Sequence, residues 1–223
     1  MKVLAIDTAT ERCSVALRID GQSIDRVIDT PRGHADLILK LVNDVLIEAG
    51  VSLRDLDGIA YGRGPGGFTG VRIAIGVVQG LAFGADRATI GVSNLAAVAQ
   101  QVAKPGERIL VCMDARMSEV YWGVFDCGAD GLVTAAGIEQ VGAPSTVDVG
   151  PAELHRAAGT GFAAYPELNE RFAALAPVNL LPRASEIAVL GEAAFTRGEG
   201  QAARDAQPIY LRDNVAIARK PMM

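Results

Sequence analysis

The sequence predicts an α/β protein in which two related halves follow one another. Short apolar strands alternate with helical segments along most of the chain, as in proteins whose sheets are covered by helices. Near the start, Val3–Thr8 is predicted to be a buried strand with an acidic end, followed by a second strand over Cys13–Arg18. The same arrangement recurs with Ile109–Asp114 and Val120–Phe125. This repetition is the main reason for the predicted fold class.

The spacing of the repeat divides the chain into two lobes. Asp7 and Asp114, which end the two apolar strands, are 107 positions apart in a chain of 223 residues. A repeat at about half of the length is typical of a duplicated fold. We therefore expect a first lobe over residues 1–104 and a second lobe over residues 105–223, with a last segment that can return to the first lobe.

The elements between and after these hairpins are predicted from hydrophobic period and from helix-end signals. Helices are predicted over Ala35–Ala49, Val71–Phe83, Leu95–Ala103 and Glu186–Arg197. Strands are predicted over Leu56–Tyr61 and Thr89–Val92. Gly50 is placed to end the first of these helices, and Ser93 to begin the third. For the last helix we expect Ser185 at the start and Gly198 at the end.

Composition argues against several classes of protein. The net charge is −5 and the pI is about 5.1, so there is no general attraction for a nucleic-acid backbone. The three cysteines and two histidines have no metal-binding or disulfide spacing, and we expect no metal. The start has no signal-peptide pattern, and no apolar run looks long enough for a membrane span. We expect a soluble, cytoplasmic protein without membrane association.

The helix over Ala35–Ala49 is apolar over an unusually wide arc. Its apolar side chains cover roughly 200° of the helix surface, whereas a surface helix needs a stripe of a little over about 100°. The excess predicts burial on two sides. One side would face the core of the chain, and the other either a neighbouring segment or a second chain.

The helix over Val71–Phe83 has only Arg72 and Gln79 as strongly polar residues, and small residues recur along one face. Glycine in a helix costs about 0.8–1.0 kcal/mol relative to alanine, so a row of glycines suggests that another helix approaches closely. That helix belongs to this chain or to a partner. From both helices we predict an association surface made of His34, Leu37, Ile38, Leu41, Val42, Val45, Ile73, Gly76, Val77, Gly80 and Gly84.

The glycine-rich loop over residues 62–70 has two readings. Backbone N–H groups at a helix start attract anions, but this loop has neither the Walker nor the Rossmann spacing. Its glycines can equally serve a tight turn and close backbone packing. The residues for a weak nucleotide site, or for a purely structural loop, are Asp7, Thr8, Thr10, Gly64, Gly66, Thr69 and Gly70.

The second acidic turn distinguishes this chain from a phosphotransferase. Such an enzyme with a duplicated fold typically has Asp-x-Gly there, because phosphate needs bare backbone. This chain has Asp114, Ala115 and Arg116, so we expect a structural pair between Asp114 and Arg116. No catalytic constellation stands out, and we assign no catalytic residue.

Several motifs resemble those of the TsaB (YeaZ) family over essentially the whole chain. They are Ile6–Thr10, His34, Gly64–Ile73, Asp114–Arg116, Glu119–Tyr121 and Pro208–Arg212, of which the G-P-G-G-F-T-G-V-R-I stretch at Gly64–Ile73 is highly specific. The resemblance implies a duplicated actin/sugar-kinase/Hsp70-like (ASKHA) fold with two lobes. It also implies a role in forming N6-threonylcarbamoyladenosine (t6A) at position 37 of ANN-decoding tRNAs.

The resemblance further implies that this chain is a non-catalytic dimerisation and scaffold subunit without a cofactor. Catalysis then belongs to a metal-binding partner, TsaD, and the ATPase TsaE joins the assembly. The chain is expected to form a homodimer when alone and to meet tRNA only within the complex. The alternatives are an ATP-dependent small-molecule kinase of the same fold and a peptidase.

Overall fold

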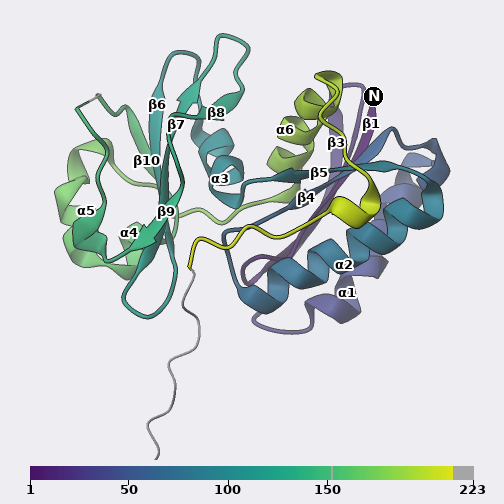
Figure 1. Ribbon diagram of the computed structural model, residues 1–223, viewed down its shortest axis with the longest axis horizontal. Helices are drawn as coiled ribbons and strands as arrows, with labels where there is room; N and C mark the ends of the chain where they lie inside the picture. Colours follow the sequence, from purple (N-terminus) through teal and green to yellow (C-terminus); the bar gives the residue numbers. More distant parts are fainter. Residues whose placement is uncertain (152, 213–223) are drawn as a thin grey trace, which may run out of the picture.

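A computed structural model describes residues 1–151 and 153–212, which form two lobes, each built on a five-stranded sheet (Figure 1). The first sheet has the order β3 (Gln22–Asp29), β2 (Arg12–Ile19), β1 (Lys2–Asp7), β4 (Gly58–Gly62) and β5 (Ala88–Val92). The second has the order β10 (Arg156–Ala158), β6 (Arg108–Asp114), β7 (Val120–Cys127) and β8 (Val133–Ala135), with β9 (Gln140–Gly142) also paired to β7. The helices are α1 (His34–Ala49), α2 (Phe68–Ala85), α3 (Asn94–Val102), α4 (Gly161–Ala164), α5 (Pro166–Arg171) and α6 (Ala184–Thr196).

The strand pairings repeat from one lobe to the other. β1 pairs antiparallel with β2 and parallel with β4, and β6 pairs antiparallel with β7 and parallel with β10. Asp7 lies opposite Ser14, and Asp114 lies opposite Val120, so both aspartates stand at the same place in their hairpins. The predicted pair of strand–Asp–strand hairpins is therefore confirmed.

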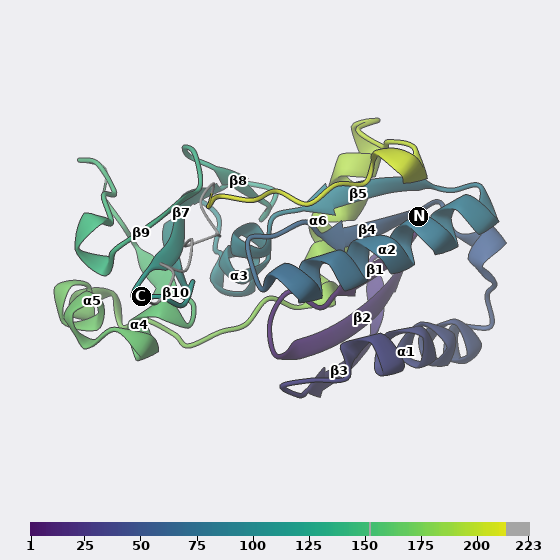
Figure 2. The ribbon, with the colours of Figure 1, turned by 60° about the horizontal axis from the view of Figure 1, so that its bottom comes forward.

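The first sheet is covered on both faces. Leu4 and Ile6 of β1 lie in one core with α1 and α2, while Val3 and Ala5 lie in another with α6. This explains why β1 is a continuous apolar run rather than an alternating one. α1 and α2 cover the same face of the sheet, and α6 lies on the other (Figures 1 and 2).

One core connects the two lobes. α3 follows the first sheet along the chain but packs against β6, β7 and β8, and α6 follows the second sheet but packs against β1, β2 and β4. The core between them contains Val98 from α3 and Ile187 from α6, together with strands of both sheets. A hydrogen-bonded ion pair between Arg18 of β2 and Glu192 of α6, 2.6 Å apart, lies at its edge. α6 thus follows the second sheet along the chain but belongs by its packing to the first.

The helix ends show where local sequence signals succeed. Gly50 adopts the left-handed conformation at the end of α1 (φ 66°), and Ser93 accepts a hydrogen bond from the backbone N–H of Ala96 at the start of α3. Gly198 has φ 77° just beyond α6. The expected cap at Ser185 is wrong, because α6 begins at Ala184 and Ser185 therefore lies inside the helix. The hydroxyl of Ser185 donates a hydrogen bond to the carboxylate of Glu186 instead.

By length and composition, α2 is apolar enough to cross a membrane, contrary to the expectation that no run is long enough. The core helices of folded domains can be equally long and apolar. Val71, Ala74, Val78 and Ala82 of α2 are buried in the core of the first lobe. Packing against the sheet therefore accounts for this side of the helix.

Candidate partner-binding surface and interlobe cleft

The structure separates the predicted association residues into two groups. Ile38, Leu41, Val42 and Val45 are buried in the core between α1 and the first sheet, so they leave little area for a partner. His34, Leu37, Ile73 and Val77 are partly exposed. Most of the wide apolar arc of α1 is therefore explained by its own lobe.

The glycines of α2 are on the open face of that helix. Gly76, Gly80 and Gly84 are exposed, and apart from the adjacent backbone of α2 itself, a Cβ added to any of them would meet no atom of the described residues within 4 Å. Close packing within the chain therefore does not explain them among the residues that the structure describes. Of the two readings left open for this row, the intramolecular one has no support here.

Large apolar side chains are exposed on both α1 and α2, and sequence reasoning left them out of the predicted site. Leu39 and Ile47 of α1 are 54% and 70% exposed, and Phe83 of α2 is 85% exposed. Leu39 and Ile47 are eight positions apart, so they share one face of α1. α1 and α2 contact each other on the same face of the first sheet (Figure 1), and we call their exposed faces the α1–α2 surface.

The glycine-rich loop is fixed by a buried polar chain that begins at Asp7. Asn94 donates to Asp7 Oδ1 (2.7 Å) and accepts from the backbone N–H of Gly64 (2.8 Å). Asp7 is fully buried, and burial raises its pKa from 3.8 to about 6. A Cβ at Gly62 would lie 2.1 Å from Asp7 Oδ1, so this position requires glycine. Sequence reasoning missed Asn94, which is 87 positions from Asp7.

The loop glycines allow the backbone of the first acidic turn to come close. A Cβ at Gly70 would lie 2.0 Å from the carbonyl oxygen of Thr8, and one at Gly66 would lie 2.6 Å from that of Ala9. Thr8 Oγ1 donates to the carbonyl of Gly70 (2.7 Å), and the N–H of Gly67 donates to that of Ala9 (2.7 Å). This geometry supports the structural reading of the loop.

The remaining loop candidates are arranged differently. Gly64 has φ 101° and precedes a cis peptide bond to Pro65. Thr10 Oγ1 accepts from the backbone N–H of Arg12, and Thr69 is exposed in the first turn of α2.

An open cleft of about 740 Å³ lies between the lobes, where the two acidic turns face each other. It is lined by Thr8, Thr10, Gly66 and Gly70 from the first lobe and by residues around Asp114 from the second. Asp7 does not line it, so this carboxylate is not available to a ligand there. The cleft has the size of a small-molecule site.

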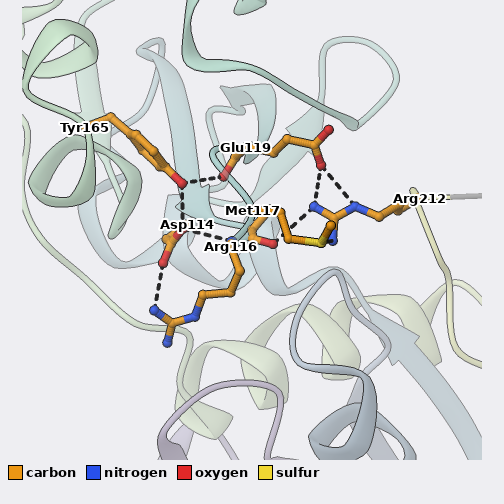
Figure 3. A network of polar contacts seen from close by, with 7 residues as sticks. Asp114, Arg116, Met117, Glu119, Tyr165 and Arg212 are labelled. Carbon is orange, nitrogen blue, oxygen red and sulfur yellow. Dashed lines mark hydrogen bonds and ion pairs between the residues drawn. The ribbon is translucent and has the colours of Figure 1, made fainter. Parts of the chain in front are cut away.

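The second acidic turn carries large side chains (Figure 3), whereas glycines lie close to the backbone of the first. Arg116, Met117 and Ser118 have φ values of 60°, 55° and 59°, a left-handed run that is costly for residues with a Cβ. Asp114 accepts from the backbone N–H of Arg116 (2.9 Å) and pairs with its guanidinium (3.0 Å). The predicted structural pair is confirmed. Tyr165, which was not predicted, also donates to Asp114 (3.0 Å).

Residues 207–212, which we call the C-terminal strap, connect the two lobes. The N–H of Ile209 donates to the carbonyl of Arg63 (2.9 Å) in the first lobe. The ring of Tyr210 stacks on Phe68 at the start of α2, with centroids 5.6 Å apart. At the other end, Arg212 pairs with Glu119 and donates to the carbonyl of Ala115 (3.2 Å) (Figure 3). The strap thus reaches from α2 to the second acidic turn.

No group of three or more His, Cys, Asp or Glu side chains suited to a metal lies within residues 1–151 and 153–212. His34 has a buried Nε2 without a hydrogen-bond partner in these ranges, and His155 Nδ1 accepts from the backbone N–H of Arg108 (3.1 Å). Cys13, Cys112 and Cys127 are buried and unpaired.

Comparison with known proteins identifies the family. Residues 28–220 match the family model of TsaD, tRNA N6-adenosine threonylcarbamoyltransferase. The tRNA threonylcarbamoyladenosine biosynthesis protein TsaB of Escherichia coli (strain K12) is 41% identical over 228 residues, with 99% of both chains covered. The chain belongs to the TsaB (YeaZ) family. The TsaB of Haemophilus influenzae is 35% identical over 232 residues, covering 99% of this chain and 98% of the relative.

The solved structure of a TsaB-family member agrees with the fold. YeaZ from Pseudomonas aeruginosa superposes with a TM-score of 0.85 at 43% identity, covering 94% of this chain and 99% of that one. The fold is therefore the duplicated ASKHA-type fold with two lobes, as predicted.

Proposed function

We propose that this chain is a non-catalytic dimerisation and scaffold subunit of the complex that forms t6A at position 37 of ANN-decoding tRNAs. The names of its TsaB relatives and the match to the TsaD model support a place in this biosynthesis. In this proposal the chain supports the catalytic subunit TsaD, the ATPase TsaE joins the assembly, and tRNA is met only within it. Its net charge of −5 agrees with weak tRNA binding by the chain alone.

The α1–α2 surface is the observation that carries the proposal. It combines exposed Leu39, Ile47 and Phe83 with a row of glycines that nothing in the described chain approaches. Large exposed apolar side chains on two neighbouring helices favour an interaction site. Small residues let two helix backbones come close, which offsets their low helix propensity. A second copy, or TsaD in its place, is the occupant we propose.

The two alternatives have less support. A kinase of this fold needs phosphate to approach the second acidic turn, where Asp114 already holds Arg116. A cysteine peptidase needs a reactive thiolate, but burial raises the pKa of all three thiols, that of Cys13 to about 11. If the scaffold proposal fails, the kinase is the next hypothesis to test, because the interlobe cleft could hold a small molecule.

The test is light scattering after size-exclusion chromatography, with the protein alone and mixed with TsaD from the same source. We expect a homodimer alone and a heterodimer on mixing. Gly80→Leu should weaken both by steric exclusion, while the lobe stays folded because leucine is the better helix former. Gly137→Leu is the matched control, since Gly137 is exposed and open but lies in the second lobe. A protein that is monomeric alone and forms no complex on mixing with TsaD would overturn the proposal.

A further inference from the structure

A second interlobe cavity, of about 360 Å³, shares no lining residue with the interlobe cleft. Its walls come from β5 and the start of α3 in the first lobe, from β8 and the loop before β9 in the second, and from the end of α6. Two charged side chains in this wall, Arg63 and Glu139, come from different lobes. We call it the Arg63–Glu139 cavity.

Arg63 is held in place but makes no ion pair with any of the described residues. Its N–H donates to the carbonyl of Val92 (2.9 Å), and its carbonyl accepts from Ile209 of the strap (2.9 Å). The guanidinium Nε is buried without a hydrogen-bond partner in residues 1–151 and 153–212. A half-buried cation of this kind is stabilised by a carboxylate that bonds to it, because guanidinium and carboxylate match in geometry.

Glu139 is the complementary group on the other side. The hydroxyl of Ser93 donates to its carboxylate, and Ser93 is itself fixed as the cap of α3 by the N–H of Ala96 (3.2 Å). Burial raises the pKa of Glu139, and the hydrogen bond from Ser93 and the charge of Arg63 oppose this rise only in part. Within the described ranges, no ion pair joins Glu139 to any cation, Arg63 included.

The wall also contains Asp130, Arg197 and Glu199. Asp130 accepts a hydrogen bond from the backbone N–H of Leu132 (3.0 Å). Arg197 pairs with Glu199 at 2.5 Å, so this cation is already neutralised. Ile90, Phe125 and Leu190 give the cavity an apolar side. At about 360 Å³ the cavity is at the lower end of the range for small-molecule sites, about 300–1,000 Å³.

We propose that the Arg63–Glu139 cavity binds a small aliphatic α-amino acid. The ligand carboxylate bonds to the guanidinium of Arg63, the ammonium bonds to the carboxylate of Glu139, and the side chain lies against Ile90 and Leu190. Only a zwitterion satisfies both charged walls at once, since a simple anion or a simple amine leaves one of them uncompensated. This proposal is independent of the α1–α2 surface.

The test uses three probes of the same carbon skeleton in saturation-transfer NMR titrations of the full chain. L-valine carries both charges, isovalerate lacks the amine, and isobutylamine lacks the carboxylate. We expect L-valine to bind at least about ten-fold more tightly than either single-charge probe, because it alone pairs with both groups.

Two variants assign the ends of the ligand. Arg63→Met should weaken both carboxylate probes at least about ten-fold and leave isobutylamine unchanged. Glu139→Gln keeps an acceptor for Ser93, and should lower the affinity for L-valine to that for isovalerate without weakening isovalerate. Arg116→Met, in the interlobe cleft, is the control and should change nothing. A purely structural role for these residues predicts no such difference between probes.

Two outcomes would overturn the proposal. The first combines two results: L-valine shows no saturation transfer at millimolar concentration, and Arg63→Met and Glu139→Gln show a stabilising coupling in a double-mutant cycle. Together these results would mean that the two side chains pair directly in solution. The second is L-valine binding that both variants leave unchanged, which would place the ligand elsewhere.

Discussion

The buried carboxylate of Asp7 makes the stability of the fold depend on pH. Its Oδ2 has no hydrogen-bond partner in the described residues, and its nearest side-chain partner, Asn94, is neutral. Burial raises its pKa from 3.8 to about 6. For an acid with a raised folded-state pKa, stability is highest below the unfolded pKa and falls as pH rises through the folded one. The whole effect is about 3 kcal/mol, since one pKa unit corresponds to about 1.4 kcal/mol.

Asp7→Asn keeps the size of the side chain and removes its titration. Between about pH 4.5 and about pH 7.5, the free energy of unfolding of the native protein should fall by about 2 kcal/mol relative to the variant. Urea unfolding followed by circular dichroism across this range measures the difference. Asp29→Asn is the control of opposite sign, because hydrogen bonding to Arg12 lowers the pKa of Asp29. Parallel pH profiles for the native protein and Asp7→Asn would refute the reasoning.

Three further predictions concern the loop, the strap and the thiols. Gly70→Ala should lower the free energy of unfolding by about 1–3 kcal/mol, because its Cβ would lie 2.0 Å from the carbonyl oxygen of Thr8. Arg212→Ala should leave the global unfolding free energy within about 1 kcal/mol but speed amide exchange near Glu119, since the partly exposed ion pair that holds the strap is lost. The three buried cysteines should not react with Ellman's reagent at neutral pH until urea unfolds the protein, because burial raises each thiol pKa.

The first two of these predictions have matched control variants. Gly137→Ala, at an exposed and open position of the second lobe, should change the free energy of unfolding by less than about 0.5 kcal/mol. Arg204→Ala removes an exposed arginine before the strap and should not change exchange at the second acidic turn. Rapid labelling of a thiol in the folded protein, or unchanged exchange in Arg212→Ala, would contradict the burial and the strap contacts respectively.

Periodicity and end signals predict most of the first lobe. Apolar runs such as residues 3–6 are buried on both faces, and Gly50 and Ser93 end or begin helices where their conformational preferences place them. β3 was not predicted, because it is an edge strand of mixed, half-exposed residues without a continuous apolar run. The short strands and helices of the second lobe, three to six residues long, carry too few residues for a period to appear.

The candidate site could be predicted from sequence only where all the residues of the pattern lie on one helix. The spacing of Gly76, Gly80 and Gly84 shows that they share a face, and the structure adds that this face is open. For α1 the apolar arc is wide enough that sequence does not distinguish the core residues from exposed Leu39 and Ile47. Contacts between distant segments, such as Asp7 with Asn94 or Glu119 with Arg212, have no local pattern and come from the tertiary fold alone.

The exchange of α3 and α6 between the lobes has a consequence for biosynthesis of the chain. One face of the first sheet is complete only when α6 packs on it, and α6 ends at Thr196 of 223 residues. During translation, one apolar face of the N-terminal strands therefore stays uncovered until most of the chain has left the ribosome. Release of the nascent first lobe alone would yield an aggregation-prone fragment, so the two lobes mature together.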